Sequence, residues 1–247
     1  MSEVLNWFSF KGKKSTDFGV RVELLPPITL AEERVKFKSA VGRSGSIEQT
    51  EGDAVFEDMV LTIECYIESL DNLNGIAAWL FGYGDLILPN RPGGHYVGRV
   101  IGKIEMERVI KAREVRRFFV DFRVEPYFYL DDSAIIESTE TSFAITNPGS
   151  VASAPRITIY GHGDIQLAIA GQSIYLQRLE DGIILDAHLM DALTLDGAQL
   201  ANGHVSGDMP TIPPGVSTVA WLPLEFEDDN NPGTVTRIVI EPRWRCR

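Results

Sequence analysis

Hydrophobic and polar residues alternate along much of this chain, with the two-residue period that is typical of β-strands. In Phe118–Val124 the even-numbered positions are all apolar, whereas Asp121 and Arg123 fall on the opposite face. Four segments rich in β-branched and aromatic residues are predicted as strands: Val20–Leu24, Met59–Ile67, Val97–Glu107 and Arg116–Tyr129. Their lengths predict long antiparallel hairpins with one buried face.

One helix is expected to interrupt this pattern. Four apolar residues recur at helical spacing, namely Leu73, Ile76, Ala77 and Leu80. Asp71 is placed to cap the start of the helix, and Gly82 is placed to end it. Because so short a helix is marginal by itself, we expect it to pack against a sheet.

The pattern changes after Tyr129. Aromatic residues become sparser, the stretch Asp131–Ser142 is polar, and no lysine follows. Short apolar segments then recur between turn signals: Asn147-Pro148-Gly149, Gly161–Asp164, Asp181-Gly182, Asp196-Gly197, Pro213-Pro214-Gly215 and Asn231-Pro232-Gly233. Short strands separated by such turns predict an antiparallel β-sandwich. We therefore expect a mainly β domain with one short helix in residues 1–134 and the sandwich in residues 135–247.

Composition and charge narrow the class of protein. Of the 247 residues, 44% are hydrophobic and 23% are charged, which is ordinary for a chain with a folded core. The net charge is −12, with −4 in residues 1–134 and −8 in residues 135–247, and there is no basic stripe. Specific nucleic-acid binding is therefore disfavoured, although DNA could pass such a surface without sticking.

Membrane and export signals are not expected either. No apolar run approaches the roughly 20 residues that span a bilayer. The lysines of Met1–Lys14 follow its apolar residues, which is the reverse of a signal peptide. We expect a chain that is made and folded in a cytoplasm, with no membrane contact.

The search for catalytic motifs predicts no enzyme, no cofactor and no metal site. The four histidines are scattered, at His95, His162, His188 and His204. No two of them have the i, i+4 spacing with which a helix presents metal ligands. His162 lies in a glycine-rich segment and is predicted to be a solvated turn residue. The stretch Gly42–Gly45 resembles a nucleophile elbow but is one residue too short.

Acidic residues and cysteines have structural interpretations. Aspartates recur every five residues at Asp181, Asp186, Asp191 and Asp196, a spacing that does not make them converge, so we predict turn and loop carboxylates. Asp228–Asn231 is predicted to be a solvated turn, and the alternative interpretation is a calcium-binding loop. Cys65 is predicted to be a buried free thiol, whereas Cys246 could be exposed near the end of the chain.

Aromatic and basic residues leave two alternatives open. Trp221 and Trp244 either pack in the core of the sandwich, which is favoured, or contact a sugar. The charged run around residues 111–117 is either a solvated strand end or a set of salt bridges to another subunit. Its basic members are Lys111, Arg113, Arg116 and Arg117.

Several local motifs, taken in order along nearly the whole chain, resemble the distal tail protein family of siphophages. In the first half, Phe8–Val20 is similar to the opening hairpin of the family and Val41–Gly45 to a turn before a strand pair. Gly82–Leu88 is similar to the end of its helix, and His95–Val100 to the long strand that follows. In the second half the motifs are Asn147-Pro148-Gly149 with Ala154–Gly161, then Ile212–Trp221 and Glu241–Arg245, which are similar to the first and last strands of a sandwich.

The resemblance implies a structural protein of the phage tail tip or baseplate. In that family the first domain assembles six copies into a ring and a galectin-like second domain projects outward. The ring joins the tail tube protein to the hub and receptor-binding apparatus, and the tape measure and DNA pass through its channel without specific binding. For this chain we expect Gly42, Arg43, Ser44 and Gly45, with Lys111, Arg113, Arg116 and Arg117, to be ring or partner contacts.

Two other functions compete with this interpretation. A carbohydrate-binding module would use Trp221 or Trp244 to recognise sugar of the host cell wall. A wall-degrading hydrolase ranks last, because no carboxylate pair stands out. Some relatives carry an additional sugar-binding module in the second domain, for which this chain has no room, so we expect a partner to bind the receptor. The expected location is the virion tail tip, after synthesis in the host cytoplasm.

Overall fold

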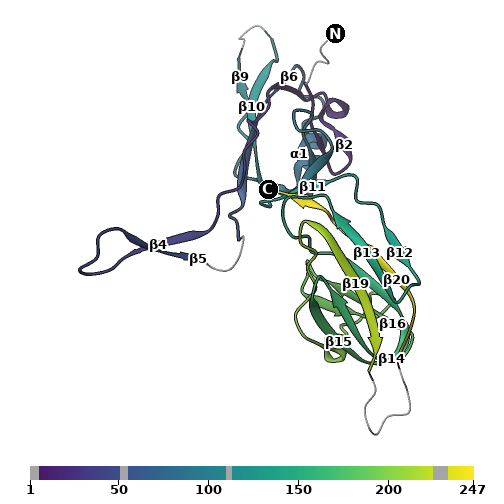
Figure 1. Ribbon diagram of the computed structural model, residues 1–247. Coiled ribbons are helices and arrows are strands. Elements are labelled where there is room, and N and C mark those ends of the chain that lie inside the picture. Colours follow the sequence, from purple (N-terminus) through teal and green to yellow (C-terminus); the bar gives the residue numbers. More distant parts are fainter. Residues whose placement is uncertain (1–5, 51–54, 110–112, 225–232) are drawn as a thin grey trace. The chain divides into compact units, whose positions relative to one another are not determined.

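The computed structural model describes residues 6–50, 55–109, 113–224 and 233–247. It divides into two compact units, Met1–Asp131 together with Arg247 (the first unit) and Asp132–Cys246 (the second unit). Among the described residues the chain is mainly β, with one α-helix and two main antiparallel sheets (Figure 1). This confirms the fold class expected from the sequence. No helix in the described part of the chain is long and apolar enough to cross a membrane.

The first unit is built on one antiparallel sheet whose central strands run in the order β2-β1-β7-β8-β10-β6-β3. Its strands are β1 (Ser9–Phe10), β2 (Lys13–Lys14), β3 (Arg21–Leu24), β6 (Met59–Ile67), β7 (Tyr83–Ile87), β8 (Gly94–Ile101) and β10 (Arg116–Val124), with β9 (Glu107–Arg108) beside β10 and β11 (Phe128–Leu130) beside β8. The ladder between β6 and β10 is continuous from Arg116↔Ile67 to Val124↔Met59. It forms the spine of the unit.

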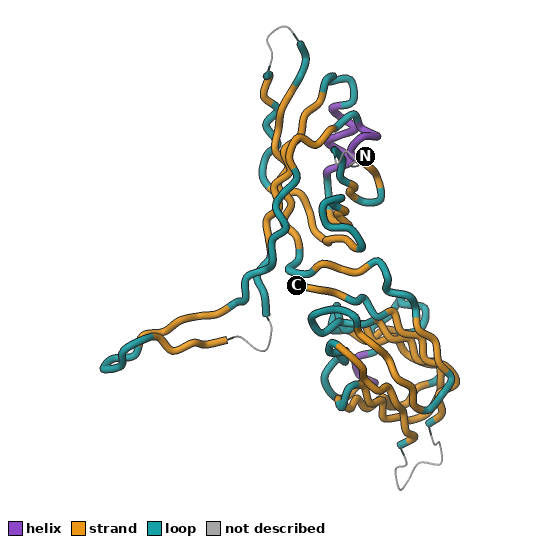
Figure 2. Tube along the Cα trace, turned by 45° about the horizontal axis from the view of Figure 1, so that its top comes forward, coloured by secondary structure: helices purple, strands orange, loops and turns teal. Residues whose placement is uncertain are grey.

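The core lies on one face of this sheet, under the helix. The even-numbered residues of Phe118–Val124 are buried, as their alternation predicts, and so are the odd-numbered residues of β6. The helix α1 (Leu73–Leu80) and the 3₁₀ turn η1 (Ser15–Phe18) lie beside the strands (Figure 2). Trp79 stacks on Phe18 with ring centroids 4.5 Å apart, and its Nε1 donates to the carbonyl of Phe10 at 2.9 Å.

Three local predictions for the first unit need correction. The residue before the helix is Asn72 and not Asp71, whose N–H donates to Ser69 Oγ in the preceding turn. The strand expected to reach Glu107 ends at Ile101, since Gly102 turns the chain with a φ of 71°. The strand expected over Arg116–Tyr129 is split into β10 and β11, with Pro126, which has no N–H for a ladder, in the gap.

The strands β12 to β20 of the second unit form one connected sheet, which the long strand β14 (Arg156–Ile169) folds into two layers, each described here as a sheet. One sheet has the order β12-β20-β14-β16-β17 and the other the order β13-β19-β14-β15-β18. The bounds are β12 (Ile136–Ser138), β13 (Ser142–Asn147), β15 (Gln172–Leu179), β16 (Gly182–Asp186), β17 (Asp191–Leu193), β18 (Val205–Ser206), β19 (Gly215–Pro223), β20 (Thr234–Glu241) and β21 (Arg245–Cys246). Isoleucine, leucine and valine side chains from the inner faces of both sheets form the core of this sandwich.

The bend in β14 replaces a turn that the sequence predicted over Gly161–Asp164. Tyr160 and the residues before it pair with β16 and β20, whereas Ile165 and the residues after it pair with β15 and β19. The register shifts on both sides of the bend, and Gly163 has a φ of 77°. Glycines and bulges let one strand change sheets at a corner. The prediction of a turn here is wrong: the chain bends but stays in a strand.

Candidate functional site

The first group of predicted contact residues lies at the tip of a separate hairpin, formed by β4 (Val35–Ser39) and β5 (Ser46–Thr50). These strands pair with each other in a two-stranded sheet of their own. Gly42, Arg43, Ser44 and Gly45 are all exposed in the connecting turn. Gly42 and Gly45 have φ values of 81° and 85°, which favour glycine. The turn was expected to precede a strand pair; instead it joins the two strands.

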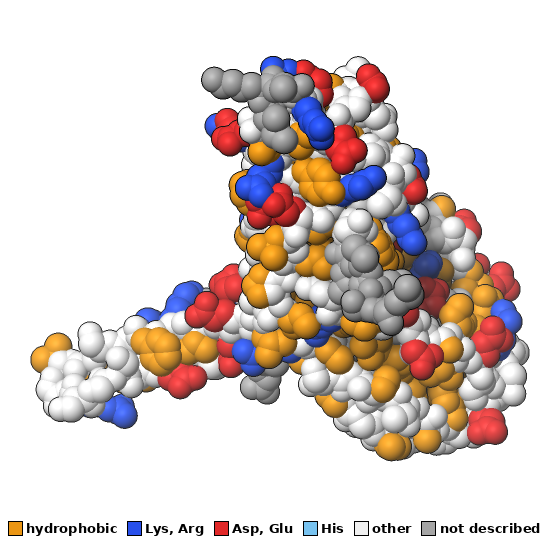
Figure 3. Space-filling model, turned by 90° about the horizontal axis from the view of Figure 1, so that it is seen from above, with side chains coloured by type: hydrophobic (Ala, Val, Ile, Leu, Met, Phe, Trp, Pro, Cys, Tyr) orange, Lys and Arg blue, Asp and Glu red, His pale blue; other side chains and the backbone are white. Residues whose placement is uncertain are grey.

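The hairpin (residues 35–50) has no buried face of its own. Phe37 is 69% exposed, Val41 is fully exposed, and Ile47 is also exposed. Lys36 and Lys38 alternate with Phe37 along β4, so hydrophobic and basic groups are mixed along its length (Figure 3). Because an isolated two-stranded hairpin is marginally stable in water, this hairpin is a good candidate for contact with another surface.

The root of the hairpin is fixed firmly in the first unit. Arg34 and Glu57 form a bidentate ion pair, with Nε–Oε1 at 2.7 Å and Nη2–Oε2 at 3.1 Å. Phe56, next to Glu57, packs edge-on against Tyr127 with ring centroids 6.1 Å apart, and the Arg247 guanidinium lies 5.0 Å from the Phe56 ring. The hairpin therefore has an anchored base and an exposed tip.

The second group of predicted contacts lies at the start of β10, the end of the strand remote from the hairpin. Its three described arginines differ in their partners. Arg117 pairs with Glu64 on the adjacent strand β6 and with Glu23 on β3, the next strand beyond it, with Arg117 Nε 2.8 Å from Glu23 Oε2. Arg116 Nη2 lies 3.1 Å from Glu114 Oε2, and Arg113 is exposed. Lys111 lies outside the described residues.

The two groups lie at opposite ends of the β6–β10 ladder. Arg116 pairs with Ile67 at one end, and Val124 pairs with Met59 at the other, just after the hairpin root. A nine-residue antiparallel ladder is about 27–30 Å long. The structure therefore does not bring the two groups together. They can contact two different surfaces.

The two tryptophans considered for sugar binding are placed differently. Trp244 is buried, with 4% of its surface exposed. Trp221 is half-buried and lies two residues after Val219 on β19, so both side chains are on the inward-facing side of the strand. The stretch Asp228–Asn231, considered above as a turn or a calcium-binding loop, lies outside the described residues.

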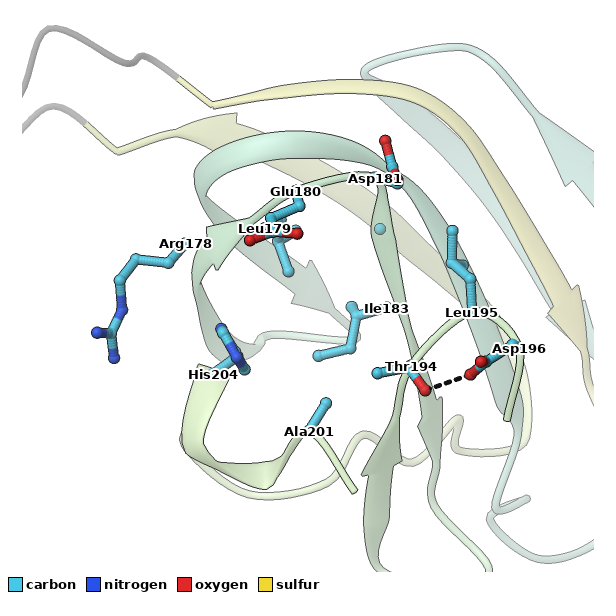
Figure 4. Close-up of a pocket in the computed structure, with 11 residues that line it drawn as sticks. Arg178, Leu179, Glu180, Asp181, Ile183, Thr194, Leu195, Asp196, Ala201 and His204 are labelled. Atoms are coloured by element: carbon cyan, nitrogen blue, oxygen red, sulfur yellow. Dashed lines mark hydrogen bonds between the residues drawn. The ribbon is translucent and has the colours of Figure 1, made fainter. Parts of the chain in front are cut away.

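A cavity of about 420 Å³ opens in the second unit, beside the turn between β15 and β16 (Figure 4). Its floor is apolar, formed by Leu179, Ile183 and Ala201. His204, from the 3₁₀ turn η2 (Asn202–His204), has Nδ1 2.9 Å from the carbonyl oxygen of Gln177. Sequence reasoning missed this cavity, because its lining comes from three separate segments.

The carboxylates around the cavity do not form a metal site. Asp181 and Asp196 lie on different sides of Ile183 (Figure 4). Thr194 Oγ1 donates to Asp196 Oδ1 at 2.5 Å, and this bond, with the N–H of Ala198, lowers the pKa of Asp196. Within the described ranges, no three His, Cys, Asp or Glu side chains gather as a metal ion would require.

The five-residue aspartate series needs a partial correction. Asp181 and Asp196 are exposed at turns, as predicted. Asp186, however, is buried at the end of β16 and opposes Asp191, at the start of β17. Its carboxylate receives the Arg243 guanidinium, with Oδ1–Nη1 at 2.7 Å and Oδ2–Nη2 at 3.0 Å. Asp186 is a structural ion-pair partner rather than a loop carboxylate.

Comparison with known proteins adds one finding to this geometry. No protein-family model matches the sequence, and no curated protein matches it. Among solved structures, the crystal structure of the Dit protein of phage SPP1 superposes with a TM-score of 0.70 at 12% sequence identity, covering 95% of this chain and 97% of that chain. The chain has the fold of a phage distal tail protein.

The distal tail fold extends over both units, because the match covers nearly the whole of each chain. This confirms the resemblance that the ordered motifs indicated. The SPP1 protein is described as a paradigm of the hub adsorption apparatus in phages that infect Gram-positive bacteria. At 12% identity the match establishes the fold alone.

Proposed function

We propose that this chain is a structural component of the phage tail tip, and that six copies form a ring joining the tail tube protein to the hub and receptor-binding apparatus. The full-length match to a distal tail fold is the observation that carries this proposal. A ring component acts through its contacts rather than through chemistry at a pocket. The exposed hairpin is therefore the feature to which we assign the central role.

In this proposal the hairpin of one copy lies on the first unit of the next. Its exposed apolar groups, Phe37 and Val41, would lose water on docking. Residues 35–50 carry Lys36, Lys38 and Arg43 against Glu48, whereas the chain as a whole has a net charge of −12. A basic hairpin on an acidic chain is complementary to the body of its neighbour. Contact between two different surfaces can close into a ring.

The predicted contact residues fall into groups with different proposed roles. We assign Gly42, Arg43, Ser44 and Gly45 to the ring contact at the hairpin tip, and Arg113 to a second contact just before the start of β10. Arg116 and Arg117 already have acidic partners within the unit, which supports a bracing role in the β6–β10 ladder.

The charge of the assembly fits passage of DNA through its channel. Six copies at −12 each carry −72, and a wall with excess negative charge repels phosphate. The tape measure and DNA would then pass without specific binding. We place the protein at the virion tail tip, after synthesis in the host cytoplasm, and assign receptor binding to a partner.

Native mass spectrometry of the purified chain tests the ring and the hairpin together. We expect a species with the mass of six chains, and its loss in the double variant Phe37→Ser, Val41→Ser. The matched control is Leu189→Ser, which removes an exposed apolar side chain from a turn of the second unit and should leave the six-chain species intact. A wild-type chain that stays monomeric with its tube and hub partners present would refute the ring.

A further inference from the structure

One edge of the sandwich lacks the features by which proteins protect exposed strands. β13 is the outer strand of its sheet, and among the described residues it pairs only with β19. It has six residues, Ser142–Asn147, with no charged residue, no proline and no register shift. Edge strands are usually kept short, charged or bulged, because an open edge can pair with another chain.

The other outer strands of both main sheets follow that rule. In the second unit, β12 and β17 have three residues each and include an acid, and β18 has two residues. In the first unit, β2 consists of two lysines, and β3 carries an arginine and a glutamate with a register shift. β13 stands out as the long, neutral edge.

The backbone of β13 has groups available for a new strand. The Trp221 N–H donates to the Thr141 carbonyl at 3.0 Å, which fixes the phase of the ladder with β19. Because bonded and non-bonded positions alternate in an antiparallel pair, Ser142, Ala144 and Thr146 direct their N–H and C=O groups to the open edge. Their side chains are all exposed.

The face next to this edge is also uncharged. The outward-facing side chains of β13 and β19 are Ser142, Ala144, Thr146, Val216, Thr218, Ala220 and Leu222, whereas β15, further from the edge, carries the exposed Arg178. Val216 and Leu222 are 76% and 61% exposed. The other sheet, by contrast, carries the Arg156–Glu241 and Arg237–Glu137 ion pairs.

We propose that two copies of this chain pair edge to edge through β13, so that one sheet continues antiparallel into its counterpart. Like charges repel when they are brought into contact, and this uncharged edge lets two copies with a net charge of −12 approach without opposing like charges. With Ala144 on the two-fold axis, Ser142 of each copy lies opposite Thr146 of the other, so the edge complements itself. This contact is distinct from the ring, whose neighbours meet through two different surfaces.

The geometry allows a direct cross-linking test in the full chain carrying Cys246→Ser. In the proposed pair the two Ala144 Cα atoms are about 5.5 Å apart, as in a hydrogen-bonded antiparallel pair, which is within the range of a disulfide. We expect Ala144→Cys to form a disulfide-linked dimer under mild oxidation. The matched control, Thr218→Cys, lies on the same exposed face one strand further in, roughly 15 Å from its counterpart, and should not cross-link.

Two further measurements keep the test decisive. Circular dichroism should show that both cysteine variants unfold like the parent, because both side chains are exposed. Ala144→Lys places two positive charges across the axis, so native mass spectrometry should lose the β13-paired species while the proposed six-chain mass persists. Cross-linking of neither cysteine variant, or equal cross-linking of both, would overturn the β13 contact without bearing on the ring.

Discussion

The Asp186–Arg243 pair shows how one buried charge holds two parts of the second unit together. Burial by itself raises the pKa of the Asp186 carboxyl group, but the Arg243 guanidinium and the backbone N–H groups of Leu189 and His188 outweigh it, so the pKa is lowered. The unfolded carboxyl has a pKa of about 3.9. The pair therefore stabilises the fold above roughly pH 4, and this contribution is lost as the pH falls through the lower folded value.

Replacing Asp186 with asparagine should therefore destabilise the second unit at neutral pH. The variant leaves Arg243, whose side chain is 30% exposed, without its ionised partner, at a cost of about 1–3 kcal/mol. Urea denaturation at pH 7 should show this loss, and the difference from the parent should shrink near pH 3. Glu180→Gln, an exposed change in the same unit, is the control. An equal loss at both pH values would argue against the ion pair as the cause.

Cys65 is the opposite case, a titratable group kept neutral. Burial raises the pKa of its thiol to about 12, with a smaller effect from Glu64. Since the thiolate is the reactive form, we expect no alkylation of Cys65 in the folded chain at pH 8 and full alkylation after denaturation. Mass spectrometry of a Cys246→Ser variant treated with iodoacetamide measures this directly. Rapid labelling of the native variant would contradict the buried environment.

At the scale of elements, the bend in β14 makes a specific demand on glycine. A Cβ atom at Gly161 would lie 2.2 Å from the backbone oxygen of Thr234, so the two strands would have to separate. We expect Gly161→Ala to cost about 1–3 kcal/mol. Gly203→Ala, where a Cβ meets nothing within 4 Å, should stay within about 1 kcal/mol of the parent. Thermal unfolding of both variants separates the steric clash from a general effect of losing a glycine.

The same bend marks the limit of what alternation along a sequence can predict. Met59–Ile67 was predicted with its observed bounds, because one buried face imposes a clear two-residue period. In Gly161–Asp164 the glycines indicate a turn, and only the neighbouring strands reveal that the chain continues in a second sheet. The β4–β5 hairpin was missed as a strand pair for a related reason: without a buried face, it has no one-sided apolar pattern.

Candidate contact residues were harder to predict than strands. The sequence grouped Gly42–Gly45 with the basic run near Arg116 as contacts of one kind, but the β6–β10 ladder holds them at opposite ends. Ion pairs such as Arg117–Glu23 join residues 94 positions apart and depend on strand order, which local patterns do not contain. Residue types indicated which side chains could make contacts, whereas topology determines which are already paired.

At the scale of the whole molecule, the distribution of charge decides how copies should meet. The hairpin carries +2 on a chain whose net charge is −12. At about 0.15 M salt, electrostatic interactions between exposed charges decay over roughly 8 Å. Repulsion between whole copies is then largely screened, whereas a basic hairpin in contact with an acidic neighbour still attracts at short range. Assembly of the proposed ring should therefore be guided by the hairpin rather than prevented by the net charge.

This argument predicts the salt dependence of assembly. If the hairpin steers association, the rate of forming the six-chain species should fall as salt is raised from about 50 to 500 mM. The double variant Lys36→Glu, Lys38→Glu should assemble more slowly at low salt and lose most of that dependence. Lys13→Glu, Lys14→Glu makes the same charge change on exposed residues of β2 and should retain it. Stopped-flow light scattering compares the three proteins, and equal slowing in both variants would assign the effect to net charge instead of the hairpin.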